Sequence, residues 1–161
     1  HSQQGNNNGY CQDNPDFWFD WDNVKKNKGL FRFTKALIEQ RTTLEAVHLS
    51  DVRRDSLHDI IAQSGIRWHG TRVNQPDWGK HSHAIAMESK QPSSEHVSYV
   101  AFNAYWEDLT FELPASPSGK WQRIVDTSLT DGQDIHIKGD KKQFVTKEYL
   151  VAARSIVILI G

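Results

Sequence analysis

Amide, carboxylate and aromatic side chains are concentrated in the first 22 residues of the chain. Amides and carboxylates exchange hydrogen bonds with hydroxyl groups, and flat rings cover apolar C–H surfaces, so this mixture suits the binding of a neutral sugar. The polar members are Gln3, Gln4, Asn6, Asn7, Asn8, Tyr10, Gln12, Asp13 and Asn14, and the rings are Tyr10, Trp18 and Trp21. The alternative is a turn-rich loop in which the amides bond their own backbone. Composition by itself favours that alternative, because Asn is common in turns.

Four carboxylates in the same stretch are candidates for glycosidase chemistry. Hydrolysis of a glycosidic bond needs two carboxyl groups at a set separation, and the stretch contains Asp13, Asp16, Asp20 and Asp22. Spacing along a loop does not fix that separation, and no apolar surrounding that would raise one pKa is evident. Turn formation and helix capping are the expected roles of these aspartates, so a catalytic pair is not predicted here.

Metal and nucleophile patterns are weak. His81 and His83 would share one face of a strand, but zinc needs three or four converging ligands and no third ligand has a matching spacing. Cys11 would become a nucleophile only if a neighbouring His or Lys lowered its pKa, and none is near in sequence. The chain also lacks a Gly-rich phosphate loop and a Gly-x-Ser-x-Gly turn. We therefore predict no metal and no cofactor.

Composition narrows the class of protein. Lys and Arg number 19 and Asp and Glu number 20 among 161 residues, so charge gives no case for binding nucleic acid or an anionic membrane. No apolar run approaches the roughly 20 residues that span a bilayer. The length is also below the roughly 250 residues of a complete (β/α)₈ barrel. The single cysteine favours a reducing compartment, and a start at His1 leads us to expect a fragment or a processed product.

One early segment has helical spacing. Asp22 or Asn23 can cap a helix that runs to about Arg41. Its apolar residues recur at helical intervals and are Leu30, Phe31, Phe33, Leu37 and Ile38. This stripe needs a partner surface, because the helical part alone is too small for an independent core. A second, shorter helix is predicted from Ser50 and ends at Gly65.

After Gly65 the pattern changes to alternation, which is typical of strands. The predicted strands cover 66–68, 84–87, 98–103, 109–113, 121–126, 143–145 and 151–160. Short strands separated by turns, with no helix-sized segment between them, indicate an antiparallel sandwich or meander. The rings of this part are Trp68, Trp78, Tyr105, Trp106 and Trp121. They are either a carbohydrate platform or, as the favoured interpretation, core or interdomain packing.

Motifs along nearly the whole chain resemble isoamylase-type glycogen and starch debranching enzymes of the α-amylase superfamily. The most distinctive is the opening HSQQGNNNGYCQDN, followed by a Trp-containing segment and a helix that ends LIEQR. The later motifs are IRWHG, PDW, SHA, YVAFNAYW, FELP, WQRIVDT and VAARSIV, in that order.

The resemblance implies an α+β fragment, with the last loop and helix of a (β/α)₈ barrel followed by an antiparallel C-terminal β-sandwich domain. Residues 1–62 would complete the barrel and residues 63–161 would form the sandwich. The upstream barrel of the same protein would cover the apolar helix stripe. The localisation implied is a bacterial cytoplasm or a plastid stroma.

The family cleaves α-1,6 branch linkages of glycogen, amylopectin and limit dextrins with retention, and the resemblance implies the same for the parent protein. Its two catalytic carboxylates and its stabilising Asp would lie upstream of this chain, so the chain alone is expected to be inactive. Loops at the C-terminal face of a barrel line its active site. Candidate substrate-binding residues are therefore Asn6, Asn7, Asn8, Tyr10, Asn14 and Trp18. The alternatives are a non-catalytic glucan-binding β-sandwich module, which would bind maltooligosaccharides, and a β domain with no ligand.

Overall fold

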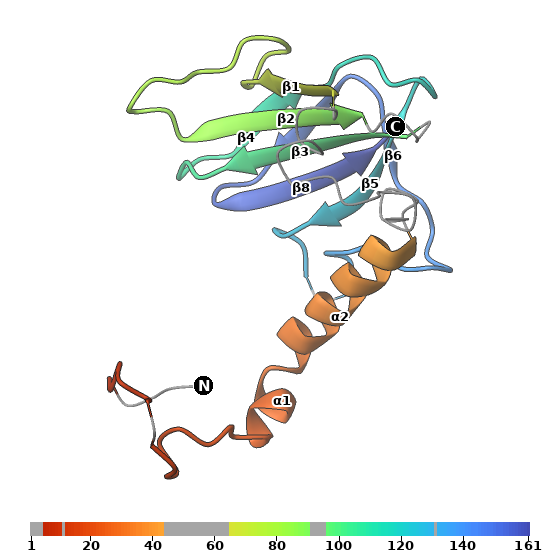
Figure 1. The fold of residues 1–161 in the computed structure, drawn as a ribbon. Coiled ribbons are helices and arrows are strands. Elements are labelled where there is room, and N and C mark those ends of the chain that lie inside the picture. Colours follow the sequence, from red (N-terminus) through yellow and green to blue (C-terminus); the bar gives the residue numbers. More distant parts are fainter. Residues whose placement is uncertain (1–4, 11, 44–64, 91–95, 131) are drawn as a thin grey trace, which may run out of the picture.

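The computed structural model describes residues 5–10, 12–43, 65–90, 96–130 and 132–161. Among these residues, two helices come first and eight strands follow (Figure 1). The helices are α1 (Asp22–Lys26) and α2 (Lys28–Thr43). The strands are β1 (Gly65–His69), β2 (Ala84–Lys90), β3 (Val97–Asn103), β4 (Leu109–Glu112), β5 (Trp121–Asp126), β6 (Phe144–Val145), β7 (Glu148–Val151) and β8 (Ser155–Ile160). The predicted start of the strands near Gly65 is confirmed.

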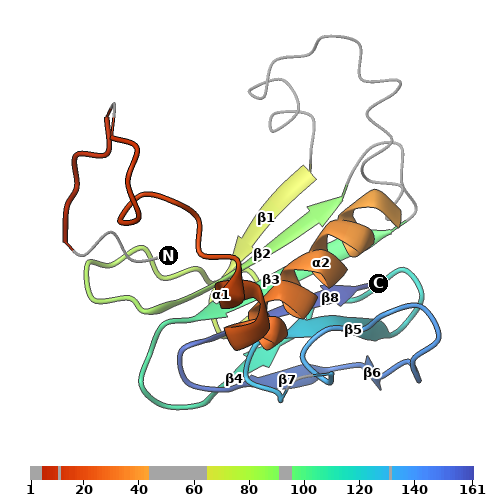
Figure 2. The same ribbon diagram turned by 90° about the horizontal axis from the view of Figure 1, so that it is seen from below.

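The strands form two antiparallel sheets that pack face to face. The larger sheet has the order β1-β2-β3-β8-β5-β6, and the smaller sheet pairs β4 with β7. Figure 2 shows α2 on the outer face of the larger sheet, with β4 and β7 on its other side. The described structure therefore has three layers, which are helix, large sheet and small sheet.

The main core lies between the two sheets. In β8, Ser155, Val157 and Leu159 are buried toward the small sheet, and the intervening isoleucines face the outer side. Both faces of β8 are covered at least in part, which explains its almost continuous apolar sequence. Trp121 is fully buried here, and its indole N–H donates to the carbonyl oxygen of Pro114 at 2.9 Å. Its polar atom is therefore satisfied inside the core.

A second, smaller core joins α2 to the outer face of the large sheet. The helix contributes Phe33, Ala36 and Leu37, and the β part contributes Ile124, Val125, Ile135, Ile158 and Ile160. An ion pair also stabilises this contact, since the Arg32 guanidinium donates hydrogen bonds to both carboxylate oxygens of Asp134 at 2.8 and 2.6 Å. Near the other end of the helix, the side-chain amide of Gln40 donates to the carbonyl oxygen of His136.

The predicted apolar stripe divides between two faces of α2. Phe33 and Leu37 pack on the sheet, but Leu30, Phe31 and Ile38 are 68%, 57% and 58% exposed. The stripe is wider than the contact with the β part can cover. An uncovered apolar strip therefore remains along the helix within the described structure.

The prediction of one helix from Asn23 to Arg41 is wrong at its first turns. The chain leaves helical geometry at Asn27, with φ −113° and ψ 35°, and the Asn27 side-chain amide donates to the carbonyl oxygen of Asn23. This local hydrogen bond competes with continuation of the helix. The predicted cap is also wrong, because Trp21 holds the N-cap position and makes no capping bond.

The prediction of one strand over 151–160 is wrong as well. A turn separates β7 from β8, and Arg154 within it has a left-handed backbone with φ 55°. The Asp108 carboxylate accepts the N–H of Ala153 at 2.9 Å and fixes this turn. The chain thereby passes from the small sheet to the large one. The predicted helix from Ser50 lies outside the described residues.

Candidate functional site

The opening segment is exposed, and its amides build turns. The side-chain oxygen of Asn6 accepts the N–H of Asn8, and that of Asn14 accepts the N–H of Asp16, both at 3.0 Å. Tyr10 is 85% exposed. These bonds match the turn-forming alternative, and they use only the oxygen atoms of the two side-chain amides. Asn7 and Asn8 are also exposed, and Cys11 lies outside the described residues.

Local contacts also occupy the aspartates of this segment. The Trp18 indole donates to a carboxylate oxygen of Asp13. Asp20 accepts the backbone N–H of Asp22 and lies 3.4 Å from the ammonium of Lys26. Asp22 pairs with Lys25 at 3.1 Å. These contacts agree with the expected turn role of the carboxylates, whereas the expected helix cap is not formed.

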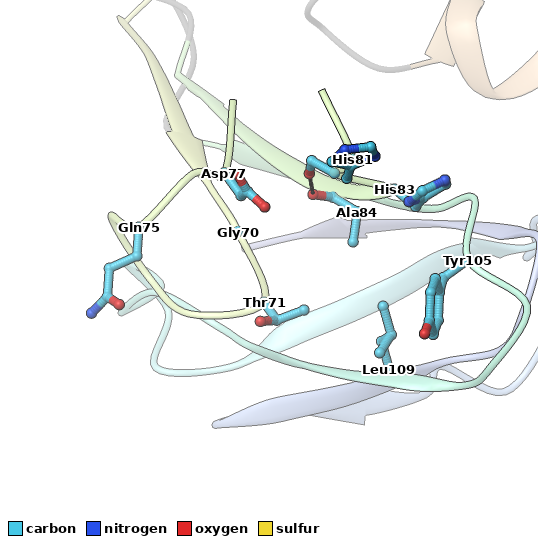
Figure 3. A pocket seen from close by; sticks show the side chains of 10 residues that line it. Gly70, Thr71, Gln75, Asp77, His81, His83, Ala84, Tyr105 and Leu109 are labelled. Carbon is cyan, nitrogen blue, oxygen red and sulfur yellow. Dashed lines mark hydrogen bonds between the residues drawn. The ribbon is translucent and has the colours of Figure 1, made fainter. Parts of the chain in front are cut away.

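A cavity of about 390 Å³ opens at one end of the sandwich, between the β1–β2 loop and the turn that follows β3 (Figure 3). Its volume is in the usual range for small-molecule sites, about 300–1,000 Å³. Its lining comes from both segments and comprises Gly70, Thr71, Gln75, Asp77, His81, Ser82, His83, Ala84, Tyr105 and Leu109. Within the described residues, no group of three or more His, Cys, Asp or Glu side chains could hold a metal ion.

Close packing fixes the β1–β2 loop. Gly70 is buried, and a Cβ placed on it would lie 2.3 Å from the carbonyl oxygen of Gln75. Asn74 has a left-handed backbone with φ 58°, and its N–H donates to Nδ1 of His69 at 2.9 Å. Asp77 accepts the N–H of Gly79 at 2.8 Å. Backbone approach, rather than side-chain bulk, therefore sets the shape of the cavity.

His69 lies beside the buried carboxylate of Glu88 under this loop. It is fully buried, and its Nε2 lies 3.4 Å from the carboxylate of Glu88, which also accepts a hydrogen bond from Arg67 at 2.6 Å. Because Nδ1 accepts a hydrogen bond, the proton of the neutral ring is assigned to Nε2, facing Glu88. Burial lowers the pKa of His69 below its ordinary value, against the opposing influence of Glu88. The sequence analysis missed this arrangement, since only the strand register places Arg67 opposite Glu88.

The rings of the β part separate into buried and exposed groups. Trp121 belongs to the core, as the favoured interpretation expects. Trp78 and Trp106 are 65% and 58% exposed, so the core does not account for them. Trp68 and Trp78 meet edge to face with ring centroids 5.5 Å apart. Tyr105 stacks on Trp106 at 3.9 Å and lines the cavity.

Residues 67–157, more than half of the chain, match the family described as isoamylase 1-3, C-terminal. The chain belongs to this family. The resemblance that its motifs suggested is therefore confirmed, and the antiparallel strands of the described structure are those of an isoamylase C-terminal region.

Curated relatives extend the match toward the start of the chain. Isoamylase 1, chloroplastic, of Oryza sativa subsp. japonica is 32% identical over 127 residues, covering 79% of this chain and 15% of the relative. Isoamylase SU1, chloroplastic, of Zea mays is 30% identical over 140 residues, covering 82% and 17%. A glycogen debranching enzyme of Erwinia tasmaniensis is 33% identical over 125 residues, covering 77% and 17%.

This chain therefore spans about a sixth of the length of these relatives. The relatives include proteins named as chloroplastic and proteins of bacteria. None of the described helices has the length and apolar character needed to cross a membrane.

Proposed function

We propose that this chain is the C-terminal portion of a debranching glycoside hydrolase that cleaves α-1,6 branch linkages with retention. Residues 1–62 complete the catalytic barrel, and residues 63–161 form the C-terminal sandwich. The family match and the names of the relatives support this assignment, together with the small share of their length that the chain covers. The substrates are glycogen, amylopectin and limit dextrins. The protein works without a cofactor in a bacterial cytoplasm or a plastid stroma.

The observation that carries this proposal is the uncovered apolar surface. Leu30, Phe31 and Ile38 form an exposed strip on α2. On the outer face of the large sheet, Phe102 and Ile156 are paired across β3 and β8 and are 36% and 38% exposed. Contiguous exposed apolar patches mark interaction surfaces. The upstream barrel of the same protein is the partner of this surface.

The opening segment then lines the cleft that binds the branch. Asn6, Asn7, Asn8, Tyr10 and Asn14 offer amide and hydroxyl groups to sugar hydroxyls, and the ring of Trp18 offers a flat apolar face. The exposure of most of this segment supports the role. The catalytic carboxylates are upstream, because the aspartates of this segment are engaged in turns and surface ion pairs.

Activity assays test the proposal directly. A longer protein that carries the upstream coding sequence should release reducing ends from amylopectin, whereas the 161-residue chain should release none. Turnover by the 161 residues alone would contradict the assignment of the carboxylates to upstream sequence. Failure of the longer, folded protein to debranch would contradict the proposed function itself.

A non-catalytic glucan-binding module is the second candidate function. The exposed rings beside the cavity favour it, since a binding module uses such rings directly. The two candidates differ in one measurement. A binding module would retain maltooligosaccharides without turnover, even when its upstream sequence is present.

A further inference from the structure

We propose that the cavity between the β1–β2 loop and Tyr105 is a second carbohydrate site, which holds part of an α-glucan chain. This proposal rests on the proposed function, because that function makes α-glucan the substrate of the protein. The site is separate from the opening segment, and the chain's own β part builds it completely.

One wall of the cavity is the ring of Tyr105, which packs against Trp106. Tyr105 stacks on Trp106 with ring centroids 3.9 Å apart, and His83 lies about equally close to both rings, at 6.0 and 5.9 Å. The backbone of Tyr105 is also fixed, since its N–H donates to the side-chain oxygen of the buried Asn103 at 3.0 Å. A ring immobilised in this way offers a flat apolar surface at little cost in conformational entropy.

The opposite wall is polar and carries no positive side chain of Lys or Arg (Figure 3). One oxygen of Asp77 accepts the N–H of Gly79, and the other makes no hydrogen bond within the described residues. His81 lines the same side with an exposed side chain, whereas the side chain of Gln75 points away from the cavity (Figure 3). This set offers both donors and acceptors to a ligand that has both, as hydroxyl groups do.

These two walls select one class of ligand. The Asp77 carboxylate disfavours a phosphate or another anion, since no Lys or Arg lines the cavity to offset it. A wholly apolar ligand would leave the carboxylate desolvated without a partner. A divalent cation lacks the required ligands in the described residues. A neutral sugar satisfies both walls, with its hydroxyls toward Asp77 and the C–H face of its ring on Tyr105.

The cavity is also preformed and lies away from α2. Gly70 and the hydrogen bond from Asn74 to His69 fix the β1–β2 loop. Figure 1 shows this loop at the opposite end of the molecule from α2, which carries the exposed apolar strip. Contact of the barrel with that strip therefore does not itself cover the cavity.

The test is a titration of the ¹⁵N-labelled 161-residue chain with maltoheptaose, followed by NMR. Saturable shifts are expected at residues 70–84 and 105–109. Tyr105→Ala should weaken the affinity about tenfold, as removal of a central aromatic contact commonly does. Asp77→Ala should weaken it severalfold. Phe144→Ala removes a more exposed ring on β6, where Lys120 lies over it, and should leave the affinity unchanged.

Several outcomes would overturn the proposal. The first is the absence of any spectral response to maltoheptaose at about 10 mM, which corresponds to very weak affinity. The second is a set of shifts confined to residues 5–22. The third is a loss of affinity in Phe144→Ala equal to that in Tyr105→Ala. If Tyr105→Ala loses its folded spectrum, Asp77→Ala decides the matter, because that side chain is exposed. The debranching assay of the longer protein is independent. Debranching without any response at the cavity overturns only this site, whereas a folded longer protein that does not debranch overturns the proposed function.

Discussion

Replacing Gly70 with alanine tests whether backbone approach sets the shape of the β1–β2 loop. The added Cβ would lie 2.3 Å from the carbonyl oxygen of Gln75 and 3.3 Å from its carbonyl carbon. Both atoms belong to the backbone, so no side-chain rotation relieves the contact. Overpacking of this kind typically costs about 1–3 kcal/mol. At a urea dependence of about 1–3 kcal/mol per M, the unfolding midpoint should fall by roughly 1 M.

Gly65 supplies a matched control at the other end of the same strand. A Cβ at Gly65 would lie 3.8 Å from the carbonyl oxygen of Lys90, which is ordinary van der Waals contact. Gly65→Ala should therefore be neutral or stabilising by about 0.5–1 kcal/mol, through lower entropy of the unfolded chain. The assay is urea unfolding followed by tryptophan fluorescence, with the amide resonance of Asn74 as a local probe. Equal midpoints for the two variants would refute the reasoning.

Three further predictions concern pH and the attachment of α2. Burial lowers the pKa of His69, so the unfolded chain binds more protons than the folded chain near the ordinary value of 6.5, and stability should fall as the pH drops from 7 to 5. His69→Asn should flatten this pH dependence in denaturant titrations. An unchanged slope of stability against pH would contradict the prediction. Burial and the hydrogen bond to Asp126 raise the pKa of Tyr149 to about 12, so stability present below pH 10 should be lost above it. This loss should be smaller in Tyr149→Phe, whose fixed cost at pH 7 is about 1–3 kcal/mol because Oδ2 of Asp126 loses its hydrogen bond, while Oδ1 keeps those from Ser128. Arg32→Ala should speed hydrogen exchange along α2, because it removes the ion pair between the helix and Asp134 of the β part. Lys35→Ala loses only an exposed contact at 4.0 Å and should not change the exchange rates. Equal exchange rates in the two variants would show that the apolar contact alone holds the helix.

Alternation and turn residues predicted most of the strands of the β part. The interval from Leu109 to Leu113 illustrates this, because Phe111 and Leu113 are buried whereas Thr110 and Glu112 are exposed, as the period of two requires. The break between β7 and β8 was not predictable in the same way. Both strands are apolar, and the turn depends on Asp108, a distant residue that binds the backbone of Ala153.

The candidate sites depended even more on tertiary structure. The sequence alone identified the amides and rings of the opening segment, and it named Trp68, Trp78, Tyr105, Trp106 and Trp121 without deciding which are core. Burial depends on sheet order, which sends Trp121 inward between two sheets and leaves Trp106 in an exposed turn. The cavity itself needs the β1–β2 loop beside the turn after β3, and no spacing within either segment indicates that meeting.

The order of the large sheet has a consequence for biosynthesis. β8 lies between β3 and β5, although both are translated before it. Until β8 emerges from the ribosome, each of these earlier strands has an unpaired edge, and such edges are prone to aggregation. The two halves of the sheet can join only late, so a nascent chain stalled before Ser155 should depend on chaperones.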